Sequence, residues 1–188
     1  MPLKCNKKYG PMRPLILAVA LLFPTAALAV GSDDDTPATP TQTTTECTDG
    51  KVWDEKSESC RTPRESRLDD DTLYRAAREF AYAGQFGHAL GALAAMSDQH
   101  DDRVLTYKGF AHRKSGDTAL GMQYYVQAIV KNPDNLLARS YMGQAFVEAG
   151  DLDAAKAQLA EIRARGGRQS WSAFALKSAI AAGPSKAY

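Results

Sequence analysis

The sequence predicts an all-α fold: a solenoid of about three helical hairpins and a capping helix, preceded by a small disulfide-stapled β-hairpin. The main observation is a pattern of about 34 residues, marked by Gly84, Gly116 and Gly150 at steps of 32 and 34 residues. A fixed period of this size indicates stacked helical hairpins, because one hairpin cannot bury its apolar face without a neighbour. The second observation is the close pair Cys47 and Cys60, which bracket a short stretch with turn and strand signals.

The first 29 residues have the composition of a secretory signal peptide. A basic head without acidic residues is followed by an apolar run over residues 15–23 and by a small-x-small site at Ala27 and Ala29. We expect cleavage after Ala29 and export to the periplasm, with residues 1–29 removed. The alternative is an uncleaved anchor, but nine apolar residues fall short of the roughly 20 that a spanning helix needs. We therefore expect no membrane span after cleavage.

The charge balance argues against nucleic acid as a partner. The whole chain carries 23 Lys and Arg residues against 22 Asp and Glu residues. Because four of the basic residues lie in residues 1–29, the mature chain would keep 19 and have a net charge of −3. Non-specific nucleic-acid binding needs a strong basic excess, so we expect no nucleic-acid partner.

Between the signal segment and the repeats, two short regions differ in composition. Residues 30–45 are rich in Asp, Thr and Pro with almost nothing apolar, so we expect a disordered linker. Residues 46–64 hold Cys47 and Cys60, the turn signal Asp49-Gly50 and the strand-like stretch that ends at Trp53. An even cysteine pair in an exported chain predicts a disulfide worth roughly 3 kcal/mol, in a hairpin separate from the helical core. Two cysteines without a nearby histidine cannot complete a four-ligand metal site.

The helical period predicts one domain over residues 68–182, followed by a tail over 183–188. We expect helices near 69–82, 86–97, 103–115, 118–131, 136–149, 152–165 and 170–182, the last of which caps the array. Gly at each hairpin turn ends the first helix in the left-handed conformation, and Asp117 and Asp151 then cap the next helix. Two columns of small residues mark the close approach of paired helices: Ala77, Gly109 and Gly143, and Ala89, Gly121 and Ala155.

The middle unit reads Gly109-x2-His112-x3-Gly116-x8-Tyr125-x2-Ala128-x4-Pro133. This pattern resembles the tetratricopeptide repeat (TPR). Together with the signal segment and the Cys-x2-Gly-x-Val-Trp-Asp-x5-Cys hairpin, it is similar to small exported TPR proteins of alphaproteobacterial type. The resemblance implies a scaffold that binds a protein or peptide in a groove lined by the first helix of each hairpin.

Carried over by register, that groove would expose a stripe of aromatic, basic and polar side chains: Tyr74, Arg78, Tyr82, Phe110, Arg113, Lys114, Ser140, Gln144 and Val147. Aromatic and Arg side chains dominate interface energetics, so the stripe suits an extended peptide with a carboxylate. The alternative is that the aromatic residues pack between neighbouring hairpins and the Arg residues are solvated. The Asn residues of the known clamp for chaperone C-termini are absent from these positions.

No constellation of residues predicts catalysis, a cofactor or a metal. The three His residues lie on different segments, and no nucleophile–base pair or phosphate-binding loop is present. The leading hypothesis is therefore a periplasmic adaptor for a protein or peptide, not an enzyme. The alternative is a cell-envelope glycan-binding protein that uses Trp53 of the Cys47–Cys60 hairpin.

Overall fold

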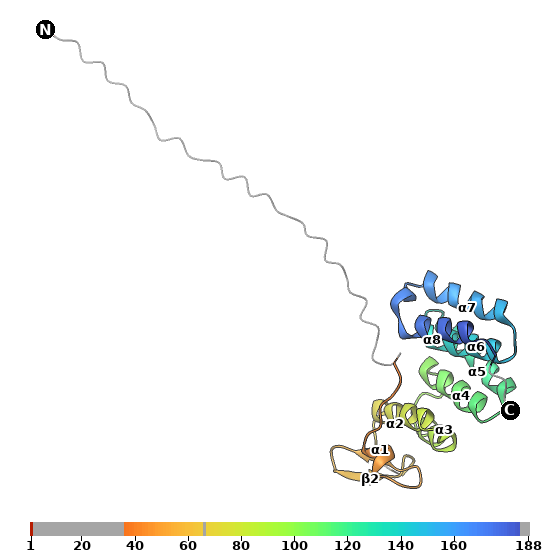
Figure 1. Cartoon of the computed structure of the whole chain (residues 1–188). Coiled ribbons are helices and arrows are strands. Elements are labelled where there is room, and N and C mark those ends of the chain that lie inside the picture. The colour runs from red at the N-terminus through yellow and green to blue at the C-terminus, as the bar shows by residue number, and fades with distance from the viewer. Residues whose placement is uncertain (2–35, 66, 185–188) are drawn as a thin grey trace. The chain divides into compact units, whose positions relative to one another are not determined.

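A computed structural model describes Met1, residues 36–65 and residues 67–184 (Figure 1). The expected signal peptide, residues 30–35 of the expected linker, and residues 185–188 of the tail lie outside the described residues, apart from Met1.

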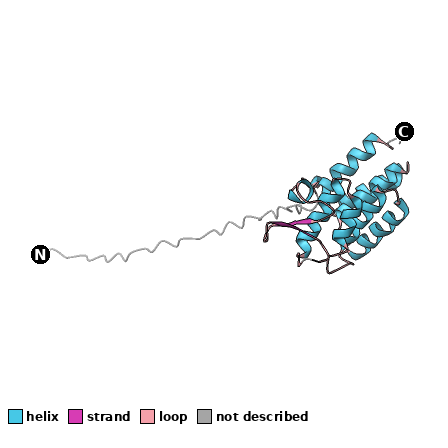
Figure 2. Ribbon diagram, turned by 90° about the horizontal axis from the view of Figure 1, so that it is seen from below, coloured by secondary structure: helices cyan, strands magenta, loops and turns pink. Residues whose placement is uncertain are grey.

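Helices make up most of the described chain (Figure 2), and six of them follow one another as three pairs. The pairs are α2 (Asp70–Tyr82) with α3 (Phe86–Leu93), α4 (Asp102–Lys114) with α5 (Thr118–Lys131), and α6 (Leu136–Glu148) with α7 (Leu152–Ala164). The short η2 (Gly167–Gln169) then leads into α8 (Trp171–Ala182). Contacts of α2 with α4, α4 with α6 and α6 with α8 place these four helices side by side. The predicted all-α solenoid with a final capping helix is confirmed.

The hairpin turns follow the sequence prediction closely. Gly84, Gly116 and Gly150 have φ angles of 75°, 102° and 81°, a region that favours glycine. After each of them the next amide donates to a carbonyl five residues back, which satisfies a free acceptor at the helix end. Asp117 and Asp151 then accept hydrogen bonds from the amides of Leu120 and Ala154, as expected of helix N-caps.

The columns of small residues lie where helices approach closely, but at Gly143 the close neighbour is not the paired helix: an added Cβ atom would lie 2.6 Å from the side chain of Leu176 in α8. Ala77, Ala89 and Ala155 are fully buried. In the second pair a Cβ atom added at Gly121 would lie 2.8 Å from the carbonyl oxygen of Gly109. Real Cβ atoms essentially never come this near to backbone oxygen, so α4 and α5 can pack at this distance only with glycine there.

Helix α3 is shorter than the sequence predicts, since it ends at Leu93 rather than near residue 97. Gln99 explains the early end, because its side-chain amide donates to the carbonyls of Leu93 and Met96 at 3.0 and 2.8 Å. Ser97 binds the carboxylate of Asp70 through its amide and its hydroxyl. These polar contacts replace the final helical turn and fix the connection to α4.

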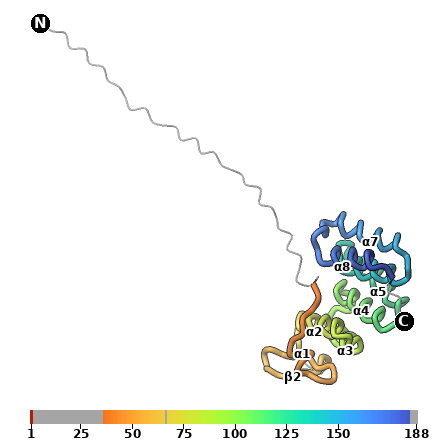
Figure 3. Tube along the Cα trace, viewed as in Figure 1, coloured from red at the N-terminus to blue at the C-terminus, as the bar shows by residue number. Residues whose placement is uncertain are grey.

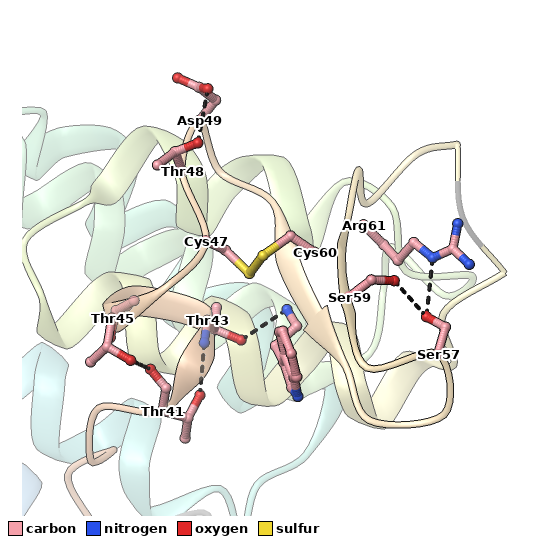
Figure 4. The surroundings of a disulfide bond; sticks show 12 residues. Thr41, Thr43, Thr45, Cys47, Thr48, Asp49, Ser57, Ser59, Cys60 and Arg61 are labelled. Atoms are coloured by element: carbon pink, nitrogen blue, oxygen red, sulfur yellow. Dashed lines mark hydrogen bonds between the residues drawn. A yellow bond between two sulfur atoms is a disulfide. The ribbon is translucent and has the colours of Figure 1, made fainter.

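The Cys47–Cys60 disulfide joins the start of the β-hairpin to its second strand (Figure 4). Strands β1 (Val52–Asp54) and β2 (Ser59–Arg61) pair antiparallel, with Trp53 opposite Cys60. The predicted disulfide-stapled hairpin is therefore present. The prediction that it is separate from the helical core is wrong. Val52 is only 1% exposed and belongs to the same apolar cluster as residues of α2 and α3. The hairpin covers one end of the first repeat.

The expectation of disorder also fails for residues 36–45. This segment includes the short α1 (Gln42–Thr45) and lies along α2 before the chain enters the hairpin (Figure 3). Its anchor is Glu79 of α2, whose carboxylate accepts hydrogen bonds from the amides and hydroxyls of Thr41 and Thr44. The segment has few apolar side chains to bury, and these hydrogen bonds to Glu79 hold it on α2 instead.

Candidate functional site

A pocket of about 360 Å³ lies between α8 and the first helix of each pair, which are α2, α4 and α6. We call it the aromatic pocket, because five rings from five helices contribute to its lining. Its lining residues are Ala81, Tyr82, Gly84, Phe86, Phe110, Lys114, Tyr141, Gln144, Trp171 and Ala175. Each of the three helix pairs and the capping helix supplies part of the wall, so the pocket exists only in the stacked array.

The walls of the aromatic pocket are held by contacts between the rings. The ring of Phe110 packs against Tyr141, Tyr82 and Phe86 at centroid distances of 4.8, 5.7 and 6.5 Å. The hydroxyls of Tyr82 and Tyr141 are 2.7 Å apart and share a hydrogen bond. Burial raises the pKa of Tyr141 well above its ordinary value, so this hydroxyl stays neutral. The pocket is thus preformed rather than dependent on a ligand.

Four of the residues predicted to bind a partner line this pocket: Tyr82, Phe110, Lys114 and Gln144. Phe110 is only 6% exposed, so it forms part of the pocket wall rather than an open surface. Lys114 and Gln144 are the polar members, with Lys114 exposed and Gln144 half-buried. These four residues from the predicted stripe therefore lie on one side of the pocket; their role in partner binding stays a prediction.

The predicted exposure of the other stripe residues is wrong. Tyr74, Ser140 and Val147 are buried. The ring of Tyr74 packs edge-on against Tyr107 of α4, and the hydroxyl of Ser140 donates to the carbonyl of Ser172 in α8. These side chains join neighbouring helices, as in the alternative interpretation that places aromatic residues between hairpins.

The two arginines of the stripe are buried and are not solvated. The side chain of Arg113 is 0% exposed, and its Nη1 atom lies 2.6 Å from Oε1 of Glu148. Its Nε atom donates to the hydroxyl of Tyr125 at 3.2 Å, so the guanidinium ties α4 to both α5 and α6. Arg78 likewise donates from Nε to the hydroxyl of Tyr107 and from Nη2 to the carbonyl of Thr36. Charge reversal at Arg113 would therefore test folding rather than binding.

Lys114 places a positive charge at the rim of the pocket, where it competes with Arg113 for the same carboxylate. The Nζ atom of Lys114 is 3.5 Å from Oε1 of Glu148, but the same oxygen already pairs with Arg113. Two cations therefore share one carboxylate, which leaves a local excess of one positive charge. Lys114 is accessible enough to pair with a carboxylate of a bound partner.

Sequence reasoning missed three of the rings in the pocket: Phe86, Tyr141 and Trp171. Trp171 was assigned to the capping helix, where it does lie, but α8 also closes one side of the pocket. Tyr141 directly follows Ser140, which was assigned to the groove. Successive helical residues point about 100° apart, so a shift of one position in the assumed face exchanges a pocket residue for a buried one.

Other kinds of site find no support in the part of the chain that the structure describes. Among those residues, no group of three or more His, Cys, Asp or Glu side chains is placed to hold a metal ion. None of the described helices combines the length and the apolar character needed to cross a bilayer.

Comparison with known families agrees with the helical architecture. Residues 112–180 match the family described as tetratricopeptide repeat. The match runs from the last turn of α4 through α5, α6 and α7 and into α8, so it includes one side of the aromatic pocket. No curated protein and no solved structure shows significant similarity to the chain.

Proposed function

We propose that this tetratricopeptide-repeat protein is a periplasmic adaptor that binds a protein partner by inserting an apolar side chain of the partner into the aromatic pocket. Repeats of this family typically form non-catalytic scaffolds for protein–protein interaction. The proposal adds to that general role a defined surface and a compartment.

The aromatic pocket is the observation that carries the proposal. Interfaces draw most of their binding energy from a few aromatic and Arg side chains in well-packed, desolvated positions. Here Tyr82, Phe110, Tyr141 and Trp171 meet around a preformed space of about 360 Å³. A cavity of that size is at the lower end of the range for ligand pockets, and it fits one large side chain rather than a whole domain.

The charge at the rim favours an acidic group near the inserted side chain. Lys114 contributes the local positive excess described above, and Gln144 offers an amide on the neighbouring helix. Electrostatic complementarity of this kind determines orientation and specificity more than affinity. We therefore infer a partner segment in which an apolar residue lies close to Asp, Glu or a terminal carboxylate.

Two features support the periplasm as the compartment. Residues 1–29 have the pattern of a signal peptide, and the Cys47–Cys60 disulfide suits an oxidising environment. Glycan binding by the hairpin is less favoured, because sugar-binding aromatic rings need an open face. Trp53 is half-buried, and its amide donates to the hydroxyl of Thr43.

Affinity capture with matched variants tests the proposed function. Residues 30–188 would serve as bait in an envelope extract, alongside Trp171→Ala and Lys114→Glu. The controls are Val130→Ala on α5 and Lys177→Glu on α8, a truncation to alanine and a charge reversal at exposed positions outside the pocket lining.

A partner of the pocket should be retained by the wild type and both controls and be lost, at least tenfold, from both pocket variants. All variants must keep the helical circular dichroism spectrum. Retention of the same proteins by the pocket variants would show that the pocket is not the binding surface. Trp53→Ala tests the alternative that the hairpin is the binding surface. If the pocket binds the partner, this variant should capture the same partner as the wild type.

A further inference from the structure

The segment formed by residues 36–45 is fixed firmly at one end. Glu79 is 6% exposed, and its two carboxylate oxygens accept four hydrogen bonds of 2.5–3.0 Å from Thr41 and Thr44. A buried carboxylate without such donors would be costly, so these bonds lock Thr41 and α1 against α2.

The other half of the segment, residues 36–40, is attached differently. At its far end Nη2 of Arg78 donates to the carbonyl oxygen of Thr36 at 2.6 Å. Between the two attachment points, Pro37, Ala38, Thr39 and Pro40 make no hydrogen bond to any described residue. A cavity of about 300 Å³ lies between this stretch and the side chains of Arg75, Arg78 and Glu79. Residues 37–40 therefore bridge a space instead of packing onto the helix.

The far attachment point is connected to the wall of the aromatic pocket through the buried side chain of Tyr107. Arg78 precedes Tyr82 by one helical turn on α2, and its Nε atom donates to the hydroxyl of Tyr107 at 3.2 Å. The ring of Tyr107 in turn packs against Phe110 and Tyr141 of the pocket wall, at 6.1 Å in both cases. An extended partner that continued from the pocket along α2 would reach Arg78.

We propose that residues 36–40 are an intramolecular ligand that occupies the α2 end of the partner-binding surface. An extended segment of the partner displaces them and presents its own backbone carbonyl to Arg78, while Thr41 and Thr44 stay on Glu79. The displacement rests on the proposed function, whereas the intramolecular binding does not.

The bridge is suited to this exchange because its two prolines restrict the free chain. Proline at a compatible position favours a bound conformation by lowering the entropy of the unbound one. Replacing Pro37 and Pro40 with Gly should therefore lower the ratio of bound to free segment by about four- to thirtyfold, without removing any hydrogen-bond donor. A short tether supplies an effective concentration in the millimolar range, so a competing free peptide binds visibly only at similar concentrations.

The test uses a synthetic peptide of residues 30–40 as the probe and the mature chain, residues 30–188, as the receptor. The backbone amide signal of Glu79, which is present in every variant, is followed by NMR during titration with up to about 5 mM peptide. We expect the Pro37→Gly/Pro40→Gly chain to bind the peptide at least about fourfold more tightly than the wild type, and Arg78→Gln in that chain to abolish binding.

Pro184→Gly, at an exposed position far along the chain, is the matched control and should behave as the wild type. Equal affinity of the peptide for the wild-type and double-glycine chains would overturn the intramolecular ligand, and so would no binding to the double-glycine chain at about 5 mM.

Affinity measurements with a partner found by capture can distinguish a failure of this inference from a failure of the proposed function. The affinity of that partner should rise at least about fourfold in the double-glycine chain. If that affinity is unchanged while Trp171→Ala abolishes capture, the pocket function stands and displacement is refuted. If the peptide results hold but no captured protein depends on the pocket, the intramolecular ligand stands and the pocket function is refuted.

Discussion

Gly109 offers a direct test of how the second repeat is packed. A Cβ atom at Gly109 would lie 2.6 Å from both Cδ1 and Cε1 of the Tyr125 ring and 3.0 Å from the carbonyl oxygen of Gly121. The ring cannot move aside easily, because it is fully buried and its hydroxyl accepts a hydrogen bond from Arg113. Gly109→Ala should therefore force helices α4 and α5 apart.

The size of the effect follows from two opposing terms. Overpacking of a tight core costs about 1–3 kcal/mol, while replacing a helical glycine with alanine gains about 1 kcal/mol. We expect Gly109→Ala to lower the free energy of unfolding by up to about 2 kcal/mol. Gly91→Ala is the matched control, since it lies within α3 with no atom within 4 Å of the added Cβ. It should stabilise the protein by about 0.5–1 kcal/mol.

Urea unfolding of residues 30–188, followed by circular dichroism at 222 nm, measures both variants. A second pair of variants, with Tyr125→Leu added, isolates the clash. Leu93 and Leu159 occupy the equivalent column of the other repeats, so leucine fits the position. Gly109→Ala should cost about 1 kcal/mol less in the Tyr125→Leu chain. Equal stability of Gly109→Ala and Gly91→Ala, or an unchanged cost of Gly109→Ala in the Tyr125→Leu chain, would refute the reasoning.

Two further predictions concern pH and redox state. Burial raises the pKa of Tyr125 from 10.0 to about 12, so the folded state holds the proton more tightly than the unfolded state. The stability that this provides is complete below pH 10 and is lost as the pH rises through 12, at about 1.4 kcal/mol per pKa unit. Tyr125→Phe should therefore flatten the fall of the urea midpoint between pH 10 and 12, and an equally steep fall in that variant would contradict the assignment. Reduction of the Cys47–Cys60 bond should lower the free energy of unfolding of the whole helical domain by up to about 3 kcal/mol, and with it the urea midpoint, because Val52 shares the core of the first repeat. A reductant should have no effect on a Cys47→Ala/Cys60→Ala chain, and an unchanged midpoint of the wild type on reduction would contradict the joint core.

The sequence predicted the parts of the fold that depend on local signals. Turn glycines with positive φ, such as Gly116, and caps such as Asp117 act within a few residues, so they can be recognised without knowledge of the fold. Close helix approach could also be predicted, because Gly109 and Gly121 recur in register with small residues of the other repeats.

What could not be predicted depends on contacts between residues far apart in the sequence. Arg113 is buried because Glu148, 35 residues later, neutralises it. Residues 36–45 are ordered because Glu79, 35 to 38 residues later, accepts their amides and hydroxyls. Composition alone describes a charged residue as exposed and a Thr- and Pro-rich segment as disordered, and here one distant carboxylate reverses each expectation.

The hydrogen bond between Tyr82 and Tyr141 bears on how the array unfolds. Solenoids are commonly treated as one-dimensional chains of units, in which each repeat is coupled only to its nearest neighbours and the ends can fray independently. This bond links the first helix pair directly to the third, between residues 59 positions apart in the sequence, without involving the second pair. Such next-nearest coupling favours loss of the three pairs in a single cooperative step. It also makes the integrity of the pocket a report on the entire array, because opening either end separates the two hydroxyls.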